Sequence, residues 1–236
     1  RGTGERLWGR VAREIARGRD VRAHPFAATS IWNVPIGDRA VYVPLGLTAP
    51  TNGYSTDDVH IVFTPGAPLR SLVDRGYWWP WTSGTSVPGT DTGVQVQVPD
   101  AWIIAPPGPT SFPNNATAAL QADGLAREFQ YTVRPTVGSN ISISDAPRAT
   151  FDLTGTGQST SYGAHGGAGM TCIGGTIRYG ELTSPDPIRH ALAVTMNMRR
   201  WGTQQGGQIT NGYRWPAIAA DAYYDGPNGY GVRGSG

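Results

Sequence analysis

Turns interrupt this chain so often that long helices and strands cannot run through most of it. Its 236 residues include 33 glycines and 19 prolines, about twice the usual share of these two residue types. Short apolar runs remain between the turns, and this pattern is typical of sandwiches and barrels, not of disordered chains. The sequence therefore predicts an all-β fold, a β-sandwich or jelly roll with one N-terminal helix.

The apolar runs define the predicted strands. They lie at residues 41–43, 60–63, 93–99, 102–105, 128–133, 140–144, 176–179 and 191–196. Residues 93–99 alternate strictly between valine and glutamine, so the valines are expected to face a core and the glutamines to face solvent or a groove. Residues 116–125 are predicted to form a short helix or a loop before the Asp123-Gly124 turn.

The two ends differ from the predicted sandwich domain at 23–225. Residues 1–22 carry seven arginines and three acidic residues, a net charge of 7 − 3 = +4. Apolar residues recur at helical spacing within 5–18, which predicts a basic amphipathic helix. We expect it to pack on the domain or on copies of itself, giving a homo-oligomer; a membrane surface is the alternative partner. Residues 226–236 read as a flexible, glycine-rich tail.

Composition restricts the classes of function. A net charge of +2 is too small for nucleic-acid binding, and no apolar stretch approaches the roughly 20 residues that span a membrane. Scarce charge (15%) with eight tryptophans suits an extracellular or virion-associated protein. The single Cys172 excludes an intramolecular disulfide and is expected to pack as a small hydrophobe. No motif for a metal or cofactor is evident, so none is expected.

Candidate catalytic residues gather in the later part of the chain. Glycines surround His165, and such a loop leaves space for a ligand. His190 precedes an apolar run predicted to be a strand, and a carboxylate such as Glu181 or Asp221 could orient it as a general acid or base. The alternative for each histidine is a structural role in hydrogen bonds to the nearby backbone.

Aromatic and arginine residues near these positions suggest a surface for sugars. Aromatic rings stack on the C–H face of a sugar ring, while arginine binds hydroxyls or carboxylates. An aromatic plug under a loop, or a protein interface, is the alternative. The candidate substrate-binding residues are Arg178, Tyr213, Arg214, Trp215, Tyr223, Trp78 and Trp79.

Two sequence patterns carry a resemblance. One is Ser30-Ile-Trp32-Asn33-Val-Pro35-Ile36; the other is the series Gly-Gly-Thr-Ile-Arg178, Glu181-Leu, Ile188-x-His190-Ala-Leu and Tyr213-Arg-Trp-Pro-Ala-x-x-x-Asp221. Together they resemble a largely uncharacterised group of secreted or cell-surface β-sandwich proteins of actinobacteria and their phages. The resemblance covers roughly residues 25–225. It implies that Trp32, Asn33, Glu181, His190 and Asp221 belong to one pattern, and it supplies no activity.

These observations support an extracellular carbohydrate-active domain that acts on a cell-wall or capsular polysaccharide. A hydrolase would use Glu181 and Asp221 as its two carboxyl groups. A lyase would use His165 or His190 as base and Tyr213 as acid, with Arg178 or Arg214 neutralising a uronate. The alternative is a glycan-binding, receptor-binding or structural module of a phage tail or surface fibre, without catalysis.

Overall fold

A computed structural model describes residues 24–35, 39, 41, 58–76, 89–106, 113–144, 147, 149–159, 162–164, 168–178, 180–188, 190–194 and 216–218. The predicted N-terminal helix, most of the predicted strand at 41–43 and the glycine-rich tail lie outside these residues. The described part is mostly β and sandwich-like, and it contains no α-helix.

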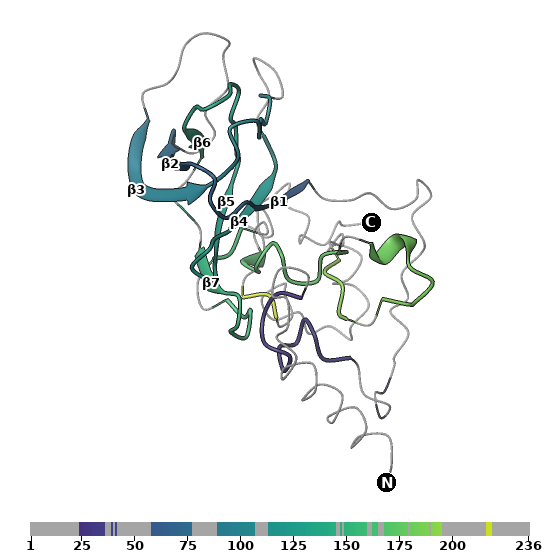
Figure 1. Cartoon of the computed structure of the whole chain (residues 1–236). Coiled ribbons are helices and arrows are strands. Elements are labelled where there is room, and N and C mark those ends of the chain that lie inside the picture. Colours follow the sequence, from purple (N-terminus) through teal and green to yellow (C-terminus); the bar gives the residue numbers. More distant parts are fainter. Residues whose placement is uncertain are drawn as a thin grey trace, which may run out of the picture.

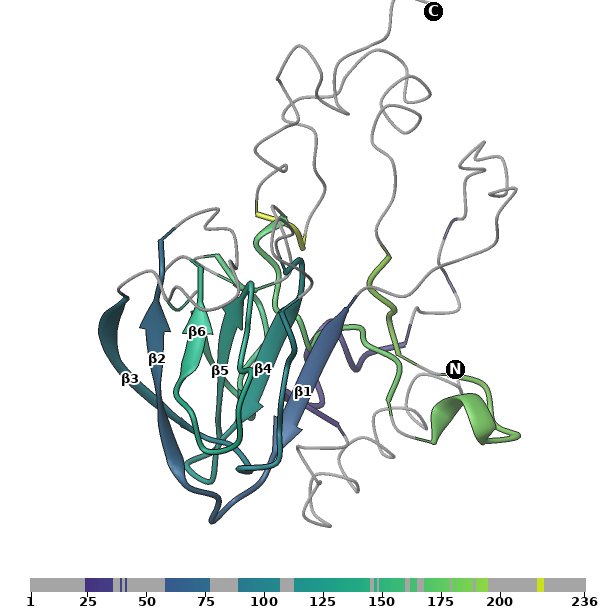
Figure 2. The same ribbon diagram turned by 90° about the horizontal axis from the view of Figure 1, so that it is seen from above.

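The described strands form two mixed sheets. Sheet A has the order β1 (Val59–Phe63), β4 (Ala116–Leu120), β5 (Leu125–Gln130) and β7 (Ala149–Asp152); sheet B has the order β3 (Thr90–Gln97), β2 (Leu69–Asp74) and β6 (Ile141–Ile143). The pairs β1–β4 and β2–β6 are parallel, and the other pairs are antiparallel. The β2–β3 pair of sheet B lies within the crossover from β1 to β4, and β6 of sheet B lies between β5 and β7 in the sequence (Figures 1 and 2).

An apolar cluster joins the two sheets. Sheet A contributes Val62, Ala119 and Phe129, and sheet B with its flanks contributes Leu72, Val96, Val98, Ile141 and Ile143. In β3, Val96 is fully buried while Gln95 is exposed, so the alternation predicted for 93–99 is present. Burial of these side chains is the main stabilising contact between the sheets.

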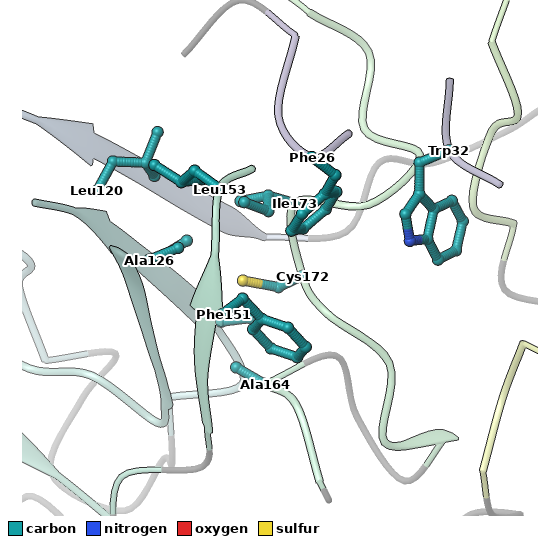
Figure 3. Close-up of a cluster of buried hydrophobic side chains, with 11 residues drawn as sticks. Phe26, Trp32, Leu120, Ala126, Phe151, Leu153, Ala164, Cys172 and Ile173 are labelled. Carbon is teal, nitrogen blue, oxygen red and sulfur yellow. The ribbon is translucent and has the colours of Figure 1, made fainter. Parts of the chain in front are cut away.

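A second cluster, here called the outer cluster, covers the opposite face of sheet A. The strands and the residue after β7 contribute Ala116, Ala118, Leu120, Ala126, Phe151 and Leu153. The loops contribute Phe26, Trp32, Ala164, Cys172 and Ile173. Both views place the purple segment at 24–35 beside green segments, on the side of sheet A away from sheet B (Figures 1 and 2). Cys172 lies within this cluster among Ala126, Phe151 and Ile173 (Figure 3).

The structure confirms some of the predicted secondary structure and contradicts other parts of it. Residues 116–120 form strand β4, not a helix or a loop, because both of its faces are buried and alternation is hidden by the small alanines. Residues 176–178 and 191–194 are not strands, and near Trp102 only one bridge forms, between Ile104 and Arg134. The strands at 60–63, 93–99 and 140–144 are confirmed in β1, β3 and β6, and the Asp123-Gly124 turn joins β4 to β5.

The contact between the sheets predicts a large difference between two substitutions. Phe129 is fully buried in the inter-sheet cluster, whereas Leu69, at the start of β2, is 53% exposed. Phe129→Ala is expected to lower the free energy of unfolding by about 3–5 kcal/mol, and Leu69→Ala by less than about 1 kcal/mol. Urea denaturation of both variants measures this. Similar losses in the two variants would contradict an inter-sheet core at Phe129.

Candidate functional site

A buried carboxylate fixes the glycine-rich segment to sheet A. Glu128 in β5 is fully buried and shares a face with Ala126 of the outer cluster. Its Oε2 accepts hydrogen bonds from the amides of Ala164 at 3.0 Å and Cys172 at 3.0 Å, and its Oε1 accepts one from the Thr171 hydroxyl. Both ends of the segment 164–172 are therefore held by one side chain.

Two ionisable groups in this region have perturbed pKa values. Burial raises the pKa of Glu128 to about 6, although its hydrogen bonds from Ala164, Thr171 and Cys172 favour the charged form. Burial, followed by the neighbouring Glu128 carboxylate, raises the pKa of the Cys172 thiol well above its ordinary value. Cys172 is thus an apolar, protonated core residue, in keeping with its interpretation as a small hydrophobe.

Glycines in this segment permit close packing of the protein on itself. A Cβ on Gly163 would lie 2.2 Å from the carbonyl oxygen of Met170, and one on Gly174 would lie 2.5 Å from Cε2 of Trp32. The Trp32 indole in turn donates a hydrogen bond to the Gly157 carbonyl at 3.0 Å. At these two positions the absence of a side chain brings loops together and does not open space for a ligand.

Beyond the anchored segment, the chain brings together three of the sequence-predicted site residues. Glu181 opens the 3-10 turn η2 (Glu181–Thr183), which stands apart from the strands in both views (Figures 1 and 2). Its carboxylate accepts a hydrogen bond from the Arg178 backbone amide at 2.6 Å and lies 2.9 Å from Nε2 of His190. The expected pairing of His190 with Glu181 is therefore present, although the described residues after His190, 191–194, form no strand.

Both ring nitrogens of His190 lie beside hydrogen-bond acceptors. Nε2 faces the Glu181 carboxylate, and Nδ1 lies 2.8 Å from the carbonyl oxygen of Ala191. Both of these partners only accept, so each ring nitrogen of His190 is engaged by a fixed group of the protein. Its side chain is only 5% exposed, against 21% for Glu181. The pair is an ion pair whose ring nitrogens are both occupied.

The pairing with His190 changes the pKa of the Glu181 carboxyl group. Burial alone would raise the pKa of its carboxyl group, but the hydrogen bonds from His190 and the Arg178 amide, with the charges of both side chains, lower it below the ordinary value. Glu181 is consequently ionised at neutral pH.

The Arg178 guanidinium lies in a polar cluster with two residues of the N-terminal loop. Nη2 donates to Oδ1 of Asn33 at 2.9 Å, and Nη1 lies 2.7 Å from Nδ1 of His24. Because a guanidinium only donates, Nδ1 of His24 must accept and is unprotonated. The Asn33 amide donates to the carbonyls of Pro25 at 2.8 Å and Ala27 at 2.9 Å, which fixes its orientation.

Sequence reasoning missed parts of this site. His24 and Glu128 were not singled out, and Asn33 entered only through the resemblance. For His24, the one signal in the sequence was the neighbouring Pro25, which indicates a turn. For Glu128 there was no signal, because a strand sequence alone does not show which polar residue will be buried. The remaining predicted site residues, His165, Tyr213, Arg214, Trp215, Asp221, Tyr223, Trp78 and Trp79, lie outside the described residues.

Comparison of the chain with protein families, with curated proteins and with solved structures finds no match. The resemblance to secreted actinobacterial and phage proteins therefore stays a prediction. Within the described ranges, no helix is long and apolar enough to cross a membrane. The same residues include no group of three or more His, Cys, Asp or Glu side chains that could hold a metal ion.

The raised pKa of Glu128 predicts a pH effect on stability. Between its ordinary value of 4.5 and its folded value of about 6, the folded protein binds the proton more tightly than the unfolded chain. Stability is therefore expected to fall by about 2 kcal/mol as the pH rises through this window, and then to level off. Urea denaturation across the window measures the slope, which Glu128→Gln should abolish. A slope that persists in the variant would assign it to another group.

The lowered pKa of Glu181 predicts the opposite sign at lower pH. The ion pair contributes stability above the ordinary value of 4.5, and this contribution is lost as the pH falls through the lowered folded value. Glu181→Gln removes the contribution, so the free energies of unfolding of variant and wild type should converge in acid. Parallel curves for the two proteins below about pH 4.5 would contradict the ion pair.

Proposed function

We propose that the protein is an extracellular carbohydrate-active domain that acts on an acidic cell-wall or capsular polysaccharide. The observation that carries the proposal is the Arg178 guanidinium, half-buried and oriented by Asn33 and His24. An arginine fixed in this way presents planar donors to a carboxylate, the group that distinguishes a uronate from a neutral sugar. The Glu181–His190 ion pair supports the turn that follows Arg178.

Of the two reactions considered, elimination fits the described residues better than hydrolysis. Hydrolysis requires one carboxyl group that is protonated near neutral pH to donate to the leaving oxygen. Glu181 does not suit that role, because both of its oxygens accept hydrogen bonds and its pKa is lowered. Elimination instead requires neutralisation of the uronate carboxylate, which a fixed guanidinium provides. The lyase alternative is therefore favoured.

A glycan- or receptor-binding module is the second candidate function, and one observation favours it. Both ring nitrogens of His190 are engaged with Glu181 and the Ala191 carbonyl, so this pair is complete without a substrate. A site of this kind binds a ligand without transferring a proton to it. We also propose a jelly-roll connectivity and an N-terminal helix, with an oligomer formed through that helix and a place on a virion.

A substitution of Arg178 tests recognition of the carboxylate. Arg178→Lys keeps the charge but loses the planar pair of donors, and it should weaken binding to a polyuronate by about tenfold or more, since a charge-assisted hydrogen bond contributes about 1.5–3 kcal/mol. Calorimetry with the polyuronate and with its carboxyl-reduced form measures this. The reduced polymer should bind weakly to wild type and variant alike.

Arg127→Lys is the matched control, because Arg127 lies in β5 and pairs with the exposed Asp123 at 2.9 Å, outside this site. It should bind like wild type. Equal affinity of wild-type protein for the polyuronate and the reduced polymer would refute carboxylate recognition. New reducing ends without the ultraviolet absorbance of an unsaturated uronate would favour the hydrolase.

A further inference from the structure

The geometry points to His24 as the catalytic base of an elimination at this site, with Arg178 binding the substrate carboxylate and Asn33 positioning Arg178. This inference rests on the proposed function and deepens it, because it assigns the proton-accepting atom. It also replaces His190 in the role that the sequence suggested for it.

His24 differs from His190 in the state of its ring. His190 is only 5% exposed and both of its ring nitrogens face fixed acceptors, so neither nitrogen is open to a substrate. His24 is exposed, and its Nδ1 accepts from Arg178, so a lone pair is present on that atom. Of these two histidines, His24 is the exposed one, and its Nδ1 is an accepting nitrogen, as a base requires.

The position of this lone pair suits the reaction. In a uronate, the acidic hydrogen is attached to the carbon next to the carboxyl group. A carboxylate bound by Arg178 therefore brings that hydrogen close to any base beside the guanidinium, and Nδ1 of His24 lies 2.7 Å from Nη1. The substrate carboxylate can take over the hydrogen bond that Nη1 of Arg178 donates to His24 in this structure. The lone pair of Nδ1 is then released beside the bound substrate.

The proton and electron balance is complete without a further reagent. Nδ1 of His24 takes the proton from the carbon next to the carboxylate, and the electron pair of that C–H bond forms a carbon–carbon double bond. The bond from the neighbouring carbon to the glycosidic oxygen breaks, and the leaving oxygen keeps its electrons and takes a proton from water. Arg178 stabilises the negative charge that builds up on the carboxylate, and the His24 cation returns its proton to solvent.

Asn33 acts through Arg178. Its amide group is held by the carbonyls of Pro25 and Ala27, and its Oδ1 accepts from Nη2 of Arg178. The loop that carries His24 therefore also fixes the guanidinium, and the distance between base and carboxylate site is set within one short segment. This arrangement predicts that proton abstraction by His24 and carboxylate binding by Arg178 both depend on the fold of residues 24–33.

The test compares His24→Asn with His60→Asn in the whole chain. The Oδ1 atom of asparagine can replace Nδ1 as an acceptor for Arg178 but does not abstract a proton, so binding should be kept while catalysis is lost. His60 in β1 lies near Asp58 and Trp102 and serves as a matched histidine control. The measurements are calorimetric affinity for a polyuronate and the ultraviolet absorbance of the unsaturated product.

We expect His24→Asn to bind the polyuronate within about threefold of wild type and to form the unsaturated product at least about a hundredfold more slowly, with His60→Asn unchanged in both. Product formation at the wild-type rate by His24→Asn would overturn the role of His24 and leave the proposed function intact. Wild-type protein that binds without forming product would also overturn it and favour the binding module. Wild-type protein that neither binds nor reacts would refute the proposed function itself.

Discussion

The hydrogen bonds of Glu128 determine where the loop region of this molecule can lie. A carboxylate with all of its side chain buried is stable only where donors replace the lost water, and here the donors are two backbone amides and one hydroxyl of the segment 164–172. The sheet thus organises a segment whose described residues form no strand of their own. Removing the donors would leave a buried charge without partners.

The candidate site is connected to this anchor along the chain. Cys172 and Ile173 fill the outer cluster directly after Thr171, and Arg178 follows a few residues later. On the other side, Phe26 and Trp32 of the N-terminal loop fill the same cluster, and His24 and Asn33 flank them. The shared outer cluster therefore brings together two loops that are distant in sequence. The polar cluster around Arg178 forms where the loops leave the core.

The sequence predicted the mostly β fold because turn residues and short apolar runs are local signals. It predicted β3 well, since Val96 and Gln95 alternate between core and solvent. It was wrong at 116–120, where alanines buried on both faces give no periodic signal. It was also wrong at 191–194, which form no strand among the described residues, although the Ala193 amide donates to the Gly175 carbonyl. Pairing between distant segments decides both cases, and no local pattern encodes it.

The same distinction applies to the site. Glu181 and His190 are nine positions apart and could be paired from the sequence. The chemical role of this pair could not be predicted from the sequence, because it depends on the Ala191 carbonyl, which occupies the second ring nitrogen of His190. A histidine whose two ring nitrogens both face fixed acceptors of the protein offers neither nitrogen to a substrate. That single backbone acceptor moves the candidate base from His190 to His24, a residue in a different loop.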